Sequence, residues 1–288
     1  MGGTYLCTTN QGNPFAFVMP DGEIRDRTAD IIEGYHQLGL DALVGIGGDG
    51  SLAILRKIAQ EGKINFVAIP KTIDNDVGVT ERSIGFDTAV NTATEALDRL
   101  HFTAASHSRA MILEVMGRDA GHIAICAGIA GGADVILIPE IPYTIANLCE
   151  RIRLRQAEGK NYSLIIVSEA VKTEDGNPVQ VGDNRYGGIG NYLAERIATC
   201  SGAETRVTVL GHIQRGGTPS PLDRLIASAF GVAAVDLIAE EKYDRMVAWQ
   251  RREVISVPIE AAISLYCAVK PESTLVKTVR GLGIYLGD

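Results

Sequence analysis

Between positions 41 and 240, short runs of aliphatic and β-branched residues alternate with longer runs in which apolar residues recur every three or four positions. Runs of the first kind are typical of buried strands, and runs of the second kind are typical of amphipathic helices. The pattern predicts strands at 41–46, 64–69, 109–114, 135–138, 163–167 and 205–210. It predicts helices at 51–60, 88–100, 121–130, 148–157, 189–198 and 221–240.

The order of these elements indicates the fold class. Strands separated by helices form βαβ units, which build mostly parallel sheets with helices on both faces. The six predicted strands are more than one small sheet needs, and the sequence contains no low-complexity linker. We therefore predict an α/β protein of two Rossmann-like, three-layer domains, with the chain crossing from one to the other.

Composition and charge narrow the classes of partner. The 288 residues carry a formal net charge of −8, so general attraction to nucleic acid or to an anionic membrane is not expected. An anionic ligand would need a local cluster of basic residues. The five cysteines are scattered without a CxxC pair, and the first residues do not resemble a signal peptide. Reduced thiols and a cytoplasmic location are therefore expected.

A glycine-rich loop, GIGGDG at 45–50, follows the first predicted strand and precedes the first helix. It fits GxGxxG, in which glycines let backbone amides approach a phosphate at a helix N-terminus. Asp49 lies inside the loop, where its carboxylate would repel a bare pyrophosphate unless a cation lay between them. The loop therefore favours a Mg²⁺–polyphosphate ligand over the dinucleotide of an NAD-dependent dehydrogenase. A capped turn without a ligand is the simpler alternative.

The second predicted strand ends in PKTIDND at 70–76, which contains a lysine, a hydroxyl and two carboxylates. Because parallel strands bind ligands at their carboxyl ends, this loop and the glycine loop could face one cleft. Phosphoryl transfer to a hydroxyl needs a base, a cation and hydrogen-bond donors. Asp74 or Asp76 could be the base, Lys71 the cation and Thr72 a donor. A solvated turn rich in Asx capping is the alternative.

Together, GGDGS and PKTIDND resemble the nucleotide loop and the catalytic loop of the phosphofructokinase family, in the same order. The resemblance runs from position 2 to about 240, through SIGFDTA at 83–89, SHSRAMILEVMGR at 106–118, AGGADVILIPE at 130–140 and ETRVTVLGHIQRGG at 204–217. It implies the phosphofructokinase fold. It also implies Mg²⁺-assisted phosphorylation of fructose 6-phosphate by ATP in glycolysis, giving fructose 1,6-bisphosphate.

The resemblance also implies roles for the residues that match the family's motifs. Asp74 would be the base that deprotonates the sugar 1-hydroxyl, supported by Thr72, Asp76 and Lys71, and Asp49 would hold Mg²⁺. The other implied site residues are Gly48, Gly50 and Ser51 for the phosphate donor, Met116, Gly117, Arg118 and Glu169 for the sugar, and His212, Arg215, Arg109 and Arg206 for its 6-phosphate.

Arg109 and Arg206 match arginines that reach the phosphate from a neighbouring subunit, so the resemblance implies a homo-oligomer, either a dimer or a tetramer. The phosphate-donor domain is predicted at 1–85 plus 214–262. The sugar-phosphate domain is predicted at 86–213 plus 263–288. Nucleic acid and membrane are not expected as partners.

Two questions stay open at this point. Gly50 is typical of family members that use ATP, whereas Lys71 occurs in members that use pyrophosphate, so ATP is favoured and pyrophosphate is the alternative. Family members also normally begin with a strand and a glycine loop that precede the segment at which this sequence starts. The resemblance therefore predicts a donor domain that is incomplete at its start, and a truncated, non-catalytic sugar-phosphate-binding or regulatory chain is a further alternative.

Overall fold

The computed structural model describes residues 12–182 and 185–287. The expectations about the start of the chain and about Cys7 concern residues outside this part. The strands are β1 (Phe17–Val18), β2 (Ile24–Arg25), β3 (Leu43–Gly47), β4 (Phe66–Thr72), β5 (Ile84–Gly85), β6 (Ala110–Val115), β7 (Val135–Leu137), β8 (Ser163–Ser168), β9 (Thr205–Val209), β10 (Arg245–Gln250) and β11 (Glu253–Pro258). The helices are η1 (Pro14–Ala16), α1 (Thr28–Gln37), α2 (Asp49–Gly62), α3 (Phe86–His107), α4 (His122–Ala130), α5 (Ile145–Ala157), α6 (Ile189–Ser201), η2 (Gly211–Arg215), α7 (Pro221–Ala239), α8 (Ile259–Ile263) and α9 (Thr274–Gly281).

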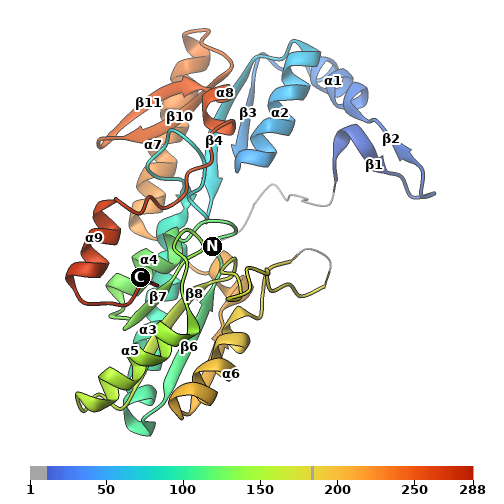
Figure 1. Cartoon of the computed structure of the whole chain (residues 1–288). Coiled ribbons are helices and arrows are strands. Elements are labelled where there is room, and N and C mark those ends of the chain that lie inside the picture. Colours follow the sequence, from blue (N-terminus) through green and yellow to red (C-terminus); the bar gives the residue numbers. More distant parts are fainter. Residues whose placement is uncertain (1–11, 183–184, 288) are drawn as a thin grey trace.

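Two main sheets organise the chain, one above the other in Figure 1. The first has the order β11-β10-β4-β3, with β5 pairing at the end of β4, and the second has the order β7-β8-β6-β9. All strand pairs of the second sheet are parallel, and only the β10–β11 pair of the first is antiparallel. The predicted α/β class with mostly parallel sheets is confirmed. The proposed boundaries between two domains stay a prediction.

Helices cover both faces of the first sheet, and the central strand β4 shows why. Its side chains alternate between two cores: Phe66 and Ala68 pack with residues of α2 and α8, whereas Val67 and Ile69 pack with residues of α7. A strand buried on both faces needs apolar residues at every position. This requirement explains why residues 66–69 form a continuous apolar run rather than an alternating one.

The second sheet is covered in the same way. In β6, Leu113 and Val115 pack with residues of α3 and α4, and Ala110 and Ile112 pack with residues of α5 and α6. Each sheet therefore forms the middle of three layers, as predicted. The carboxyl ends of the strands are left free of helices, and the loops that follow them carry most of the predicted site residues.

The expectation of reduced thiols is wrong for two cysteines. Cys149 of α5 and Cys200 of α6 form a disulfide, with their Cα atoms 6.1 Å apart. The two helices pack side by side on the same face of the second sheet, although the cysteines are 51 positions apart in the sequence. Spacing along the chain cannot reveal this contact, because it depends on the order of the strands. Cys126 and Cys267 are free.

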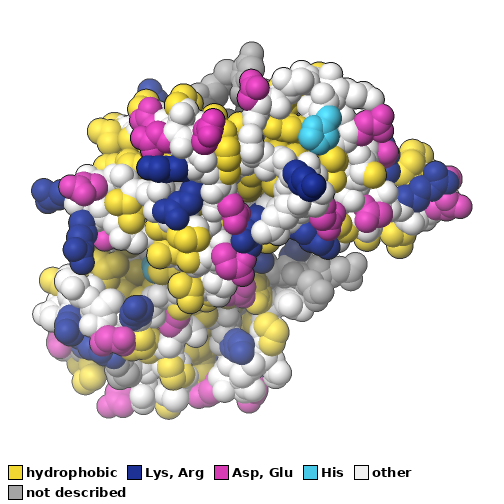
Figure 2. Space-filling model, turned by 90° about the horizontal axis from the view of Figure 1, so that it is seen from above, with side chains coloured by type: hydrophobic (Ala, Val, Ile, Leu, Met, Phe, Trp, Pro, Cys, Tyr) yellow, Lys and Arg dark blue, Asp and Glu magenta, His cyan; other side chains and the backbone are white. Residues whose placement is uncertain are grey.

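Acidic and basic side chains are intermixed on the face shown in Figure 2, and neither sign forms a large continuous patch there. On this face the mixture of charges agrees with the modest net charge of −8. Within residues 12–182 and 185–287, no helix is both long enough and apolar enough to cross a membrane.

The β10–β11 hairpin was not predicted, and its turn explains the omission. Gln250 pairs with Glu253, so the loop consists of Arg251 and Arg252 alone, with φ angles of 51° and 69°. Positive φ at both positions is typical of the type I′ hairpin turn, which usually contains Asn or Gly. Two arginines therefore give no turn signal, although they adopt the turn conformation.

This strained turn yields a stability prediction. Replacing both residues, as Arg251→Asn with Arg252→Gly, should raise the free energy of unfolding by about 1 kcal/mol, because the left-handed conformation costs these residues less. Thermal or denaturant unfolding would measure the change. The pair Arg251→Lys with Arg252→Lys keeps the charges and the strain and serves as the control. Equal stabilities of the two double variants would contradict the prediction.

Candidate active site

The loop from Thr72 to Gly85 carries the two carboxylates singled out in the sequence. Thr72 Oγ1 lies 3.1 Å from Asp74 Oδ2 and donates a hydrogen bond to it, and it accepts one from the Asp74 main-chain N–H at 3.2 Å. Asp74 and Asp76 are 7% and 3% exposed, so both carboxyl groups are largely removed from water. Among the described residues, Asp74 Oδ1 and both carboxylate oxygens of Asp76 have no hydrogen-bond partner.

Burial raises the pKa values of both Asp74 and Asp76. It raises the pKa of Asp74, and the positive charge of Arg215 is the largest opposing effect. Burial also raises the pKa of Asp76 to about 6, with further increases from the carboxylates of Asp74 and Asp49. Both groups are therefore better proton acceptors than exposed aspartates, as a general base requires.

The glycine loop lies next to this acidic loop. Gly48 is the N-cap residue of α2, and a Cβ placed on it would lie 3.6 Å from Cβ of Thr72. Asp49 begins α2, a helix of 14 residues whose N-terminus carries partial positive charge. Gly50 and Ser51 follow in the first turn, and both are exposed. The predicted donor loop and catalytic loop thus meet at one edge of the first sheet.

Arg118 connects the two sheets across this edge. It follows β6 of the second sheet, and its Nη1 lies 3.2 Å from Oδ1 of Asp49. Both side chains are partly exposed, so this ion pair contributes little to stability. The ion pair does show how the two sheets are placed, because it requires the carboxyl ends of β3 and β6 to face each other.

The predicted sugar-binding segment is organised by two side chains. Glu169 Oε1 accepts hydrogen bonds from the main-chain N–H groups of Gly117 and Arg118, at 3.2 and 3.0 Å. Burial raises the pKa of Glu169, and these two hydrogen bonds oppose the rise. Gln214 Oε1 accepts from the Met116 main-chain N–H at 2.7 Å. Glu169 and residues 116–118 are therefore brought together as predicted.

Gln214 was missed by the sequence analysis, which took His212 and Arg215 from the same GHIQR segment. Gln214 is 1% exposed, and its Nε2 has no hydrogen-bond partner. A buried amide beside two exposed basic residues gives no signal in the sequence, because its partner at position 116 is 98 positions away. Among the described residues, its Nε2 is a buried donor without a hydrogen-bond partner, carried by η2.

The four basic residues predicted to bind phosphate lie in two places: His212 and Arg215 in η2, and Arg109 and Arg206 near Glu204. Arg215 is close enough to Asp74 and Glu169 to affect the pKa of both. His212 is exposed and makes no hydrogen bond or ion pair within the described residues. Arg109 and Arg206 both pair with Glu204, which immediately precedes β9.

Arg109 and Arg206 lie at the other end of their sheet. Arg109 immediately precedes β6 and Met116 immediately follows it, so about 20 Å of strand separates them. The structure of one chain therefore does not bring these two arginines to the site. Geometry of this kind is what a role in the site of a neighbouring subunit requires.

The side chains present fit a magnesium ion. No cluster of three or more His, Cys, Asp or Glu residues suited to a metal is found among the described residues. Mg²⁺ does not need such a cluster, since it keeps several waters and binds through one or two carboxylates plus substrate phosphates. Asp76, with two buried and unpartnered oxygens, and the nearby Asp49 supply hard oxygen donors of this kind.

An α/β fold that brings a glycine loop, buried carboxylates and basic residues to one edge has the groups that a phosphotransferase needs. Comparison with known proteins supports the phosphotransferase class. The profile of the family described as "Phosphofructokinase" matches residues 1–238. The chain belongs to the phosphofructokinase family.

Curated relatives include "ATP-dependent 6-phosphofructokinase 1" of Synechocystis, which is 73% identical, and its namesake in Nostoc, which is 72% identical. Each match covers 100% of this chain and 81% of the relative. A phosphofructokinase structure from Saccharomyces cerevisiae aligns with a TM-score of 0.79 and 28% identity, over 91% of this chain and 36% of that one. A pyrophosphate-dependent phosphofructokinase from Marinobacter aquaeolei aligns with a TM-score of 0.77 over 94% of this chain and 74% of that one. At 22% identity this last likeness concerns the fold alone.

The raised pKa of Asp76 predicts a pH-dependent gain in stability on neutralisation. A rise from 3.8 to about 6 means that the ionised carboxylate destabilises the fold by up to about 3 kcal/mol above pH 6, and not below pH 4. Asp76→Asn should therefore raise the free energy of unfolding by about 1 to 3 kcal/mol at pH 8, with a gain that shrinks as the pH falls toward 4.

Unfolding curves of the two proteins at several pH values would measure this difference. Asp98→Asn, a change at an exposed aspartate of α3, is the matched control and should show no such trend. A gain that is absent at pH 8, or that grows as the pH falls, would show that Asp76 is not destabilised by its burial.

Proposed function

We propose that the chain is an ATP-dependent 6-phosphofructokinase, which transfers the γ-phosphoryl group of ATP to the 1-hydroxyl of fructose 6-phosphate. The observation that carries this proposal is the position of Asp74, a buried carboxylate with one unpartnered oxygen beside the glycine loop. The names of relatives that are 72–73% identical over the whole chain support the same activity. Products of the reaction are ADP and fructose 1,6-bisphosphate.

In the proposed mechanism, Asp74 accepts the proton of the sugar 1-hydroxyl. As that proton moves to the carboxylate, the 1-oxygen forms a bond to the γ-phosphorus, and the bond from this phosphorus to the bridging oxygen of ADP breaks. The hydrogen bond from Thr72 Oγ1 leaves Asp74 Oδ1 available to the substrate. Burial increases the basicity of the carboxylate, which favours proton transfer near neutral pH.

Asp49 and Asp76 are proposed to hold Mg²⁺ together with the phosphates of the donor. The ion, when bound, neutralises charge on the transferred phosphoryl group. Arg118 pairs with Asp49 and so lies at the edge where these phosphates would bind. Its guanidinium would meet negative charge on the phosphoryl group, and Lys71 and the N-terminus of α2 add positive charge at the same edge.

The acceptor sugar is proposed to bind between β8, β6 and η2. Glu169 accepts hydrogen bonds from sugar hydroxyls through its second carboxylate oxygen, and residues 116–118 line the same site. His212 and Arg215 bind the 6-phosphate, completed by Arg109 and Arg206 of a neighbouring subunit. The proposal therefore includes a homo-oligomer and the two-domain division given above, with fructose 6-phosphate bound to 86–213 plus 263–288.

The donor is proposed to be ATP, with Gly48, Gly50 and Ser51 lining its phosphates. Apart from its chain neighbours and the backbone of its own helix, a Cβ placed on Gly50 would meet no atom of the described residues within 4 Å, so packing among them does not explain why this residue is glycine. Open space at the start of α2 is what an inner phosphate of a nucleotide needs. Lys71 is exposed and is compatible with either donor.

A product assay tests the proposed reaction and its base. The purified chain would be supplied with fructose 6-phosphate, Mg²⁺ and either ATP or pyrophosphate, and fructose 1,6-bisphosphate would be quantified. Asp74→Ser should lower kcat with ATP by about 10²–10⁴-fold, because it removes the general base, while the KM for fructose 6-phosphate changes little. Asp98→Ser on the exposed face of α3 should match the unmodified chain. An Asp74→Ser variant that keeps most of its turnover would rule out Asp74 as the base.

Gly50→Asp tests the choice of donor. The added carboxylate should lower kcat/KM for ATP by at least about 100-fold through charge and bulk at the inner phosphate, with the KM for fructose 6-phosphate within about threefold. Gly50→Ala adds a Cβ in open space and separates bulk from charge. Retention of ATP activity within threefold in Gly50→Asp would place the nucleotide elsewhere.

A further inference from the structure

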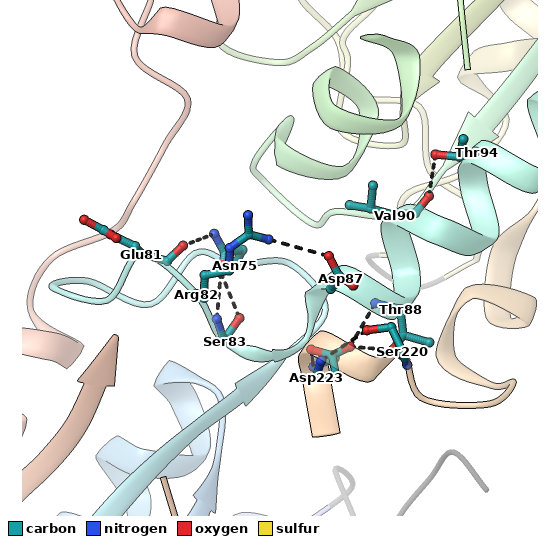
Figure 3. Close-up of polar contacts among 11 residues, drawn as sticks. Asn75, Glu81, Arg82, Ser83, Asp87, Thr88, Val90, Thr94, Ser220 and Asp223 are labelled. Carbon is teal, nitrogen blue, oxygen red and sulfur yellow. Dashed lines mark hydrogen bonds and ion pairs between the residues drawn. The ribbon is translucent and has the colours of Figure 1, made fainter. Parts of the chain in front are cut away.

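The loop that carries the two carboxylates is closed on itself. It leaves β4 at Thr72 and returns at β5, which pairs in parallel with Lys71 and Thr72. The two ends of the loop therefore lie side by side, and the position of Asp74 depends on how the interior of the loop is held. Figure 3 shows the contacts that hold it.

Asn75 is the central contact of this interior. It lies between Asp74 and Asp76, is 8% exposed and has a φ angle of 56°. Its Oδ1 accepts a hydrogen bond from the Ser83 main-chain N–H at 2.9 Å, and its Nδ2 donates to the Glu81 carbonyl at 3.1 Å. The side chain thus bridges the two halves of the loop. Asparagine tolerates the left-handed conformation better than most residues, and it adds hydrogen bonds that glycine lacks.

Ser83 extends this bridge back to the catalytic residues. It is 1% exposed, and its Oγ lies 2.9 Å from the Thr72 carbonyl and 3.1 Å from Asn75 Oδ1. The single hydroxyl proton serves one of these acceptors at a time. Because Thr72 also contacts the Asp74 carboxylate, a continuous chain of hydrogen-bonding groups runs from Asn75 through Ser83 and Thr72 to Asp74.

The far end of the loop is fixed separately. Asp223, in the first turn of α7, accepts hydrogen bonds from the main-chain N–H groups of Gly85 and Thr88, at 2.9 and 2.8 Å (Figure 3). Asp223 is 2% exposed and anchors the start of α3. Distant segments hold other points of the loop, since the Cys267 N–H donates to the Asp76 carbonyl at 3.0 Å and the Gly78 N–H donates to the Ala262 carbonyl at 3.2 Å. Asn75 adds the side-chain bonds that tie the first half of the loop directly to Glu81 and Ser83.

We propose that Asn75 is a positioning residue for phosphoryl transfer, which holds the backbone on either side of itself so that the Asp74 carboxylate points at the acceptor hydroxyl. The proposal rests on the proposed kinase function. It predicts an effect on the chemical step rather than on substrate binding, because Asn75 is buried and its side-chain bonds are all to the loop itself.

Asn75→Gly is the decisive variant, because glycine keeps the positive φ without strain and removes only the side-chain bonds. We expect kcat to fall about 10- to 100-fold, the range that a small misplacement of a reacting group costs, with both KM values within about threefold. Ser83→Ala should give a smaller loss of kcat. The double variant should be little worse than Asn75→Gly alone, since both changes break one chain of bonds.

Thr94→Ala is the matched control. It removes the bond from Thr94 Oγ1 to the Val90 carbonyl, 2.9 Å long, within neighbouring α3, and should leave kcat unchanged. The folded fraction of each variant would be measured by thermal unfolding. The proposal is overturned by an Asn75→Gly variant whose kcat is within twofold of the unmodified chain, whose loss is confined to KM, or whose loss equals its loss of folded protein. In each of these cases an active unmodified chain leaves the kinase function intact, whereas an unmodified chain that makes no product overturns both.

Discussion

Two neighbouring carboxylates held out of water are the constraint on which the organisation of the site depends. Asp74 and Asp76 would repel each other when both are ionised, and their burial raises the pKa of each. A flexible loop would relieve this cost by turning one carboxylate to solvent. The loop is prevented from doing so because its ends pair at β4 and β5 and its interior is bonded through Asn75 and Ser83. The two carboxylates therefore stay together and out of water, where they can accept a proton or bind a cation.

The rest of the structure supplies the charges that make this arrangement usable. Arg118 comes from the end of β6 and Arg215 from η2, and both oppose the repulsion between the acidic groups. They can do so only because the carboxyl ends of the two parallel sheets face each other. Within each sheet, helices cover both faces and leave the carboxyl ends of the strands for ligands.

Sequence reasoning identified the central part of the fold because burial on both faces leaves a strong pattern. The predicted strand at 64–69 is β4 at Phe66–Thr72, and the predicted helix at 221–240 is α7 at Pro221–Ala239. The β10–β11 hairpin was not predicted, because Arg251 and Arg252 adopt the φ angles of a turn although arginine is not a residue typical of turns. The disulfide between Cys149 and Cys200 was not predicted, because it depends on which helices pack on the same face of the sheet.

The sequence by itself determined the fold class, the family and the identity of the two loops, because these depend on periodicity and on contiguous motifs. Only the tertiary structure decided which of those residues meet. It placed Arg118 against Asp49, set Gln214 behind Met116 and put Arg109 and Arg206 at the opposite end of their sheet. The physical reason is that strand order and the direction of each strand end are set by packing between distant segments, and no local stretch of sequence encodes them.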